Sequence, residues 1–288
     1  MRALPGFALP RRRPVPLRAL LLGPLVAGIM VFVLFPYGWI LINSLKSEAD
    51  LLTAGVSYLP SRPTLENYRL LFEREPFAGY FLNSSVIAGA TTALSLFVAV
   101  AAAYSFSRYR FRGRNVLLTA ILLKYMVPGI LLLIPLFILL RGLGLLDTRA
   151  AVVLAHSTHA VPFSIWMLLG YFNALPRELE EAGMVDGARR LEAFVRVLLP
   201  VALPGIVATG IFIFILSWNE FLFAVTFLNT KTLQTLPIGL WTVYGGETRI
   251  YWGMITAAGV VTSLPVAALF MLFQRWLVRG LTAGALKA

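Results

Sequence analysis

The chain has 288 residues, of which 59% are hydrophobic and 13% are charged, and its mean hydropathy is +0.81. A soluble domain is about half apolar and about a quarter charged, so this composition excludes an ordinary soluble protein and indicates a polytopic membrane protein. The net charge of +12 would suggest a nucleic-acid partner in a soluble chain, but here basic residues can set membrane topology and bind anionic lipid. The chain has no cysteine, which excludes disulfides and thiolate metal sites.

Six apolar stretches are long enough to cross a bilayer. Crossing about 30 Å of hydrocarbon takes about 20 helical residues, and such windows fall at 19–43, 81–106, 115–140, 150–173, 203–227 and 251–276. The first follows a basic N-terminal tail, 1–18, but it is too long for a signal peptide and no A-x-A cleavage site follows it. We therefore expect one six-span transmembrane domain, 19–276, and a short C-terminal tail, 277–288.

The distribution of basic residues predicts the orientation of these spans. With the N-terminus inside, the inside segments hold 16 of the 25 Lys and Arg residues and the outside segments hold 8, with Lys124 within a span. Segments rich in Lys and Arg stay in the cytoplasm. The expected fold is therefore an all-α membrane protein with both termini and the loop 174–202 on the cytoplasmic side.

The first outside segment, 44–80, contains three prolines and scattered charges. It is too small for a separate domain, and residues 67–72 within it have the pattern of a short interfacial helix. At the end of the second span, cations and aromatic residues alternate over Ser107–Arg114. This pattern fits a contact with a cytoplasmic subunit, and it equally fits inside positive charge combined with an aromatic belt.

Three polar residues lie inside the third and fourth spans. Lys124 can extend its ammonium group toward the interface or pair with another group. His156 and His159 are three residues apart and share a helix face. Two histidines without a nearby cysteine or carboxylate do not complete a tetrahedral metal site, so we expect no metal and assign them a role in polar lining or packing.

The charged loop between the fourth and fifth spans predicts a pair of short helices. Pro176 suits a first helical turn, and three glutamates after it favour the positive end of the helix dipole. We expect this helix to end near Val185, a sharp turn at Asp186–Gly187, and a second helix over 188–198. Pro200 and Pro204 should then end the second helix before the fifth span.

This helix pair offers an apolar face that neither water nor lipid would satisfy on its own. The face would consist of Ala182, Val185, Ala188, Phe194 and Val197. A partner surface explains such a face most simply. The alternative is an amphipathic connector that lies on the bilayer.

Glu220 lies in the fifth span, where an ionised carboxylate costs several kcal/mol unless it is paired or hydrated. We expect it to face protein or a water-filled cavity. With Trp218 and Asn219 it could line a pathway through the membrane. It could equally be a structural tie between helices or to a partner. Its predicted depth in the membrane differs from that of Lys124, so we do not pair the two.

Motifs for nucleotide binding and hydrolysis are missing from the chain. No lysine follows a glycine, so there is no Walker A motif, and neither G-x-S-x-G nor H-E-x-x-H occurs. An enzyme is therefore not expected. Energy for active transport would have to come from another subunit.

The charged loop resembles the cytoplasmic coupling loop of ABC-importer permeases, whose pattern is roughly E-A-A-x3-G-x9-I-x-L-P. Gly183 replaces the second alanine and Val197 the isoleucine. The matching positions are Glu181, Ala182, Gly183, Asp186, Gly187, Val197, Leu199 and Pro200. The segments Ser217–Ala224, Thr235–Leu240 and Gln274–Lys287 look like the maltose-type carbohydrate branch of this family.

This resemblance implies a permease subunit that forms half of a sugar pathway in the cytoplasmic (inner) membrane of a bacterium or archaeon. It also implies a second related permease, two ATP-binding subunits that hold ATP and Mg²⁺, and an extracytoplasmic sugar-binding protein. By similarity, the binding protein would contact Thr235, Leu236, Pro237 and Gly239, and the ATPase interface would contact the tail at Gly280, Leu281, Thr282 and Gly284. The alternative function is a stand-alone channel or secondary transporter that uses Glu220 and Lys124.

Overall fold

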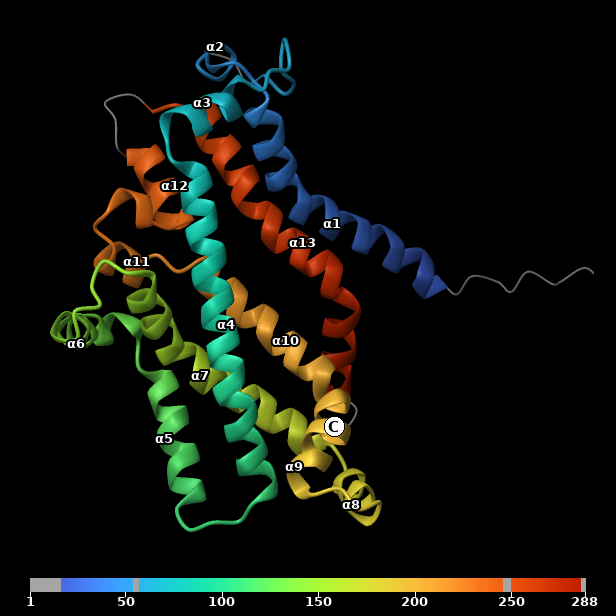
Figure 1. Cartoon of the computed structure of the whole chain (residues 1–288). Coiled ribbons are helices and arrows are strands. Elements are labelled where there is room, and N and C mark those ends of the chain that lie inside the picture. The colour runs from blue at the N-terminus through green and yellow to red at the C-terminus, as the bar shows by residue number, and fades with distance from the viewer. Residues whose placement is uncertain (1–16, 54–56, 246–249, 286–288) are drawn as a thin grey trace, which may run out of the picture.

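The computed structural model describes residues 17–53, 57–245 and 250–285, and every regular element among them is helical (Figure 1). The expectation of an all-α fold is confirmed. Residues 1–16 of the predicted basic tail and residues 286–288 lie outside the described part of the chain. The elements are α1 (Leu17–Ser44), α2 (Glu48–Leu51), α3 (Glu66–Arg74), α4 (Phe77–Arg108), α5 (Arg114–Met126), α6 (Gly129–Gly142), α7 (Arg149–Ala174), α8 (Glu178–Val185), α9 (Arg190–Ala193), the π-helix η1 (Phe194–Leu198), α10 (Leu199–Trp218), α11 (Leu222–Phe227), the 3-10 helix η2 (Lys231–Leu233), α12 (Leu236–Gly245) and α13 (Trp252–Ala285).

Five stretches of helix are long and apolar enough to cross a membrane. They are Leu22–Ser44 of α1, α4, α7, the stretch Arg190–Trp218 that ends in α10, and Trp252–Trp276 of α13. The helices α5 and α6 qualify together as a sixth candidate, although they meet at a bend of 100°. Length and composition thus allow the six predicted spans.

The third predicted span, 115–140, is a pair of helices separated by a break and not one continuous helix. The chain breaks at Val127 and Pro128, between α5 and α6. Proline lacks a backbone N–H and disfavours the helical conformation in the residue before it. Accordingly, Val127 adopts an extended backbone with φ −72° and ψ 119°.

The fifth predicted span, 203–227, is also interrupted. Helix α10 begins earlier, at Leu199, and ends at Trp218, and α11 starts only at Leu222. Between them, Glu220 directs its carboxylate at the first N–H groups of α11 rather than continuing the helix. A side-chain acceptor that satisfies these N–H groups stabilises a new helix start.

The core lies where α4, α7 and α10 pack together. Buried small residues recur every three or four positions along one face of α4, at Ala88, Thr91, Ser95, Ala99 and Ala103. Small residues let helix backbones approach closely inside a membrane. On α10, a Cβ atom added to Gly205 would lie 2.6 Å from the ring of Tyr171, so α7 and α10 are in direct contact there.

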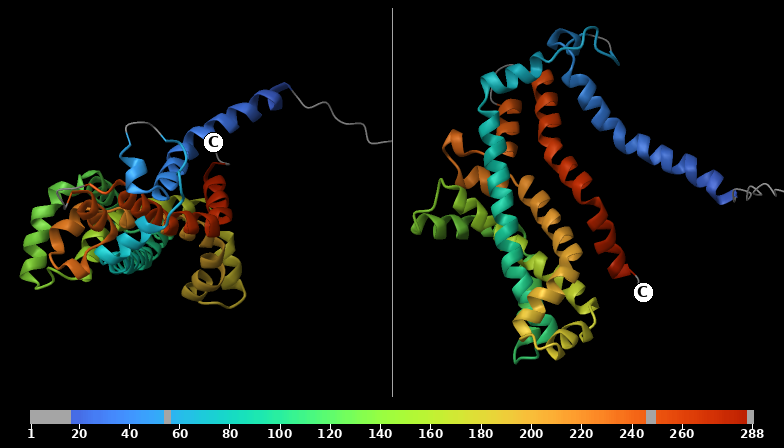
Figure 2. Two further views of the ribbon diagram at one scale, coloured as in Figure 1. Left: turned by 90° about the horizontal axis from the view of Figure 1, so that it is seen from above. Right: turned by 45° about the vertical axis from the view of Figure 1, so that its right-hand side comes forward.

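At one end of the bundle, α2 and α3 connect α1 to the start of α13. Asn67 of α3 is buried and donates hydrogen bonds to the carbonyls of Ser44 and Lys46, at 2.8 and 2.7 Å. The carboxylate of Glu48 accepts hydrogen bonds from the first N–H groups of α13. The short helix expected at 67–72 is confirmed within α3. From this end, α1 diverges from the bundle and leaves its apolar side chains exposed (Figure 2).

Candidate functional site

The first candidate site is the helical hairpin formed by α8, α9 and η1, at the end of the bundle opposite α2 and α3 (Figure 1). Gly187 forms its turn with a φ of +92°, in the left-handed region that favours glycine. The N–H of Gly187 bonds to the carbonyl of Met184, and the N–H of Ala188 bonds to that of Gly183, both at 3.1 Å. The predicted turn at Asp186–Gly187 is confirmed.

The second half of the hairpin differs from the prediction, because Pro200 and Pro204 do not end the helix. Helix α9 continues through η1 into α10, with Pro200 in the first turn of α10 and Pro204 inside it. The N–H of Leu199 bonds to the carbonyl of Phe194, the wider spacing of a π-helix. Pro200 follows this wider turn and lies in the first turn of α10. A proline, which has no N–H, can be accommodated in that position.

The two departures from the coupling-loop pattern contact each other. A Cβ atom on Gly183 would lie 3.2 Å from Cγ2 of Val197 and 3.4 Å from Cβ of Ala193. Gly183 and Val197 therefore form one packing contact that holds α8 against η1. An alanine at position 183 would crowd Val197 and Ala193, so Gly183 lets α8 approach α9 and η1 closely.

The outer face of the hairpin is smaller than predicted. Ala182 and Val185 are exposed, Val185 by 87%, and Glu181, Asp186 and Pro200 are also exposed, while Leu199 is half-buried. Phe194 and Val197 do not belong to this face. Phe194 stacks on Tyr104 of α4 with ring centroids 4.2 Å apart, and Val197 packs on Gly183. Leu191, which the sequence pattern did not single out, is exposed instead.

A buried ion pair attaches α8 to the end of α4. Nε of Arg108 donates to Oε1 of Glu180 at 2.9 Å, and the two side chains are only 6% and 8% exposed. Arg108 also donates to the carbonyl of Leu175 at 3.1 Å, and Ser107 donates to Asn173 at 2.8 Å. Sequence reasoning did not find this pair, because 72 residues separate Arg108 from Glu180 and each charge had a local explanation.

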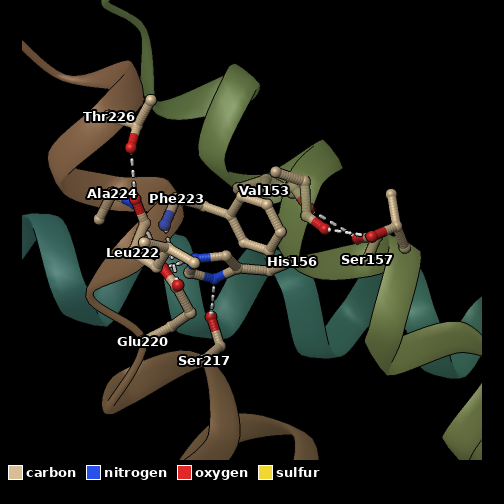
Figure 3. Close-up of polar contacts among 11 residues, drawn as sticks. Val153, His156, Ser157, Ser217, Glu220, Leu222, Phe223, Ala224 and Thr226 are labelled. Carbon is tan, nitrogen blue, oxygen red and sulfur yellow. Dashed lines mark hydrogen bonds and ion pairs between the residues drawn. The ribbon is translucent and has the colours of Figure 1, made fainter. Parts of the chain in front are cut away.

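The second candidate site lies at the break between α10 and α11 (Figure 3). Oε2 of Glu220 is 2.8 Å from Nε2 of His156, whose Nδ1 is 2.6 Å from Oγ of Ser217. The N–H groups of Phe223 and Ala224 donate to the same carboxylate at 2.9 and 3.2 Å. The side chain of Glu220 is 21% exposed, so Glu220 ties α7 to the start of α11 and still reaches open space.

That open space is a cavity of about 480 Å³ on which both helix breaks meet. Residues 125–129, at the break between α5 and α6, form one wall, and Ser217, Glu220 and Phe223 form another. A Cβ atom on Gly129 would lie 3.2 Å from Nε2 of His159. The remaining lining residues are Thr91, His156, His159, Ala160, Ile213 and Leu216.

Of the three predicted pathway residues, only Glu220 lines this cavity. Trp218 is fully buried, stacks with Phe214 and donates to the carbonyl of Thr262 on α13. Asn219 is exposed and donates back to Ile215 of its own helix. Lys124 donates to the carbonyl of Thr158. Among the described residues, no group of three or more metal-ligating side chains comes together.

The residues predicted to contact the binding protein, after α11 and in the first turn of α12, are largely buried. Thr235, Leu236 and Gly239 are buried and Pro237 is half-buried, and the N–H of Leu236 donates to Ser84 of α4. The large exposed apolar side chains of α12 are Trp241 and Tyr244, and Asn229, Thr230, Lys231 and Thr232 are exposed before it. The predicted tail is helical as far as Ala285, as a continuation of α13. At Gly280, Leu281, Thr282 and Gly284 the structure describes the helical backbone only.

An apolar helical bundle with two interrupted spans and a protruding helical hairpin defines a membrane-embedded permease subunit. The chain belongs to the family of binding-protein-dependent transport system inner membrane components, whose model matches residues 85–283. It is therefore an inner membrane protein of a binding-protein-dependent transport system, and the expected family and location are confirmed.

Relatives and solved structures agree with this assignment. The chain is 39% identical over 259 residues to the sulfoquinovosyl glycerol transport system permease protein SmoH of Agrobacterium fabrum, covering 90% of each chain. It is 35% identical to the trehalose/maltose transport system permease protein MalG of Thermococcus litoralis, covering 93% of this chain and 96% of the relative. A chain of a bacterial ABC transporter involved in the import of the acidic polysaccharide alginate has the same fold, with a TM-score of 0.75, 22% identity and coverage of 94% and 99%.

Proposed function

We propose that this chain is one permease subunit of an ATP-driven sugar importer and forms half of its translocation pathway. The N- and C-termini and the hairpin of α8, α9 and η1 face the cytoplasm, in line with the excess of basic residues predicted for the inside segments. The cargo is a carbohydrate, in line with the two named relatives, which belong to transport systems for sulfoquinovosyl glycerol and for trehalose/maltose.

The hairpin is the observation that carries the proposal. Its turn depends on Gly187, its outer face exposes Ala182 and Val185, and η1 leads without interruption into α10. A partner that moves the hairpin would therefore move α10, which borders the cavity at Glu220. Alternating access would follow from this motion, because the two helix breaks meet on the same cavity.

The other subunits follow from the class of importer. A second related permease would complete the pathway, two ATP-binding subunits would hold ATP and Mg²⁺ and dock on the hairpin, and an extracytoplasmic sugar-binding protein would deliver the cargo. Because Thr235, Leu236 and Gly239 are buried, we assign the contact with this binding protein to the exposed Trp241 and Tyr244 of α12. The largely buried segment from Thr235 to Gly239 would hold α12, and with it these two exposed side chains, in place.

The test is to purify the chain with its native partners, reconstitute the complex into liposomes and screen sugars with the cognate binding protein. One sugar should stimulate ATP hydrolysis and accumulate in an ATP-dependent manner. Transport by this chain alone, without ATP, would instead support a stand-alone channel or secondary transporter. The geometry does not favour that alternative, because Glu220 pairs with His156, and Lys124 bonds to the carbonyl of Thr158.

A further inference from the structure

The ion pair between Arg108 and Glu180 is almost completely removed from solvent. Such a pair resists displacement, because separating the two groups leaves an uncompensated charge in surroundings of low polarity. Arg108 is the last residue of α4, and its guanidinium also holds the carbonyl of Leu175, just before α8. The pair therefore fixes α8 with respect to α4 in both position and direction.

Glu180 also determines which face of α8 points outward. Glu180 and Gly183 are three residues apart and share the face of α8 that points to the bundle, since residues at this spacing are neighbours on a helix. On this face Glu180 binds Arg108, and Gly183 packs on Val197. The opposite face exposes Glu181, Ala182 and Val185. A rotation of α8 about its axis would break both attachments and turn this exposed face away.

The hairpin connects to the bundle at several points. One is the continuous backbone from α9 through η1 into α10. A second is the packing of Phe194 of η1 on Tyr104 of α4. The ion pair attaches α8 itself to α4, the helix that runs the length of the bundle and packs against both α7 and α10 (Figures 1 and 2). Through the ion pair, a displacement of α8 itself would reach α4.

We infer that Arg108 and Glu180 are a positioning pair of the transport cycle, which fixes the rotation of α8 and transmits its displacement to α4. The inference rests on the proposed function, in which an ATPase subunit moves the hairpin. Neither residue needs to contact sugar or nucleotide. Without the pair, ATP hydrolysis would continue, but less of the motion would reach the cavity.

The experiment compares the number of sugar molecules imported per ATP hydrolysed by reconstituted complexes. For Glu180→Gln and Arg108→Gln we expect complexes that still hydrolyse ATP but import about tenfold less sugar per ATP, within the usual range of coupling between sites. The control is Arg141→Gln, which removes the same charge from an exposed position in α6, away from the hairpin. This control should keep the wild-type ratio.

A double variant separates positioning from folding. Replacing both charges by apolar residues of similar size often leaves stability unchanged, so Arg108→Met with Glu180→Met should assemble normally and still show the lower ratio. A wild-type ratio in this double variant would overturn the inference. Its failure to assemble, while Arg141→Gln assembles, would also overturn it, because the pair would then serve folding. If the wild-type complex imports no sugar on ATP, the proposed function itself fails.

Discussion

Substitution of Gly187 tests whether the shape of the hairpin turn governs transport. Gly187 has a φ of +92°, and a Cβ atom added there would meet nothing within 4 Å. A substitution therefore changes the backbone preference without a steric clash. The left-handed region costs an L-residue about 1 to 2 kcal/mol, which lowers the equilibrium constant for forming the turn by about 5- to 30-fold. Asparagine tolerates this region best and a β-branched residue worst.

We therefore expect ATP-driven sugar uptake by the reconstituted complex to fall in the order Gly187→Asn, Gly187→Ala, Gly187→Val. The matched control is Gly113→Ala, because Gly113 has a φ of +84° and equally open surroundings but lies in the loop before α5. This control should lower thermal stability by a similar amount and leave the sugar imported per ATP unchanged. Equal uptake by all three Gly187 variants, or the reverse order, would refute the assigned role of the turn.

Three further predictions concern stability, measured by thermal unfolding of the purified complex. Glu220→Ala removes the acceptor of two N–H groups and the partner of His156 and should cost about 1 to 3 kcal/mol; an unchanged melting temperature would contradict this role. Gly205→Ala places a Cβ atom 2.6 Å from the ring of Tyr171 and should cost about 1 to 3 kcal/mol, and combining it with Tyr171→Leu should restore most of the loss. Hydrogen bonds, chiefly from Thr230, hold the pKa of Asp147 below its usual value of 3.8. A lowered carboxyl pKa stabilises the fold at pH values above the pKa of the unfolded chain, and this contribution should vanish as the pH falls through the pKa of the folded chain. Asp147→Asn should remove that dependence of the melting temperature on acid pH.

Local sequence signals predicted the all-helical fold, most of the long apolar helices and the hairpin turn. Apolar run length identified the membrane helices, since crossing hydrocarbon requires a minimum number of residues. Gly187 identified the turn, because few other residues adopt its backbone conformation. Both properties belong to a few neighbouring residues, and this is why they could be read without a structure.

Hydropathy could not reveal the two interrupted spans. Pro128 lies in an apolar run whose composition is that of an ordinary span, and helices inside membranes often tolerate proline. Whether such a helix kinks or breaks depends on partners elsewhere in the chain. The break at Glu220 depends on His156, which is 64 residues away, and such a pairing leaves no local signal.

The same limit applies to the pair of Arg108 and Glu180 and to the contact between Gly183 and Val197. Each residue had a sufficient local explanation: inside charge for Arg108, the helix dipole for Glu180, and simple replacement for the other two. Only the packing of α8 against α4 and η1 shows that they act in pairs. The two positions at which the chain departs from the family pattern therefore face each other across one tight contact.

The two helix breaks also determine which face of the subunit can meet lipid. Hydrocarbon offers no hydrogen bonds, so interrupted backbone at membrane depth is tolerated only against protein or water. The cavity beside Pro128 and Glu220 must therefore border protein or water, and this side of the bundle cannot serve as a lipid-facing surface.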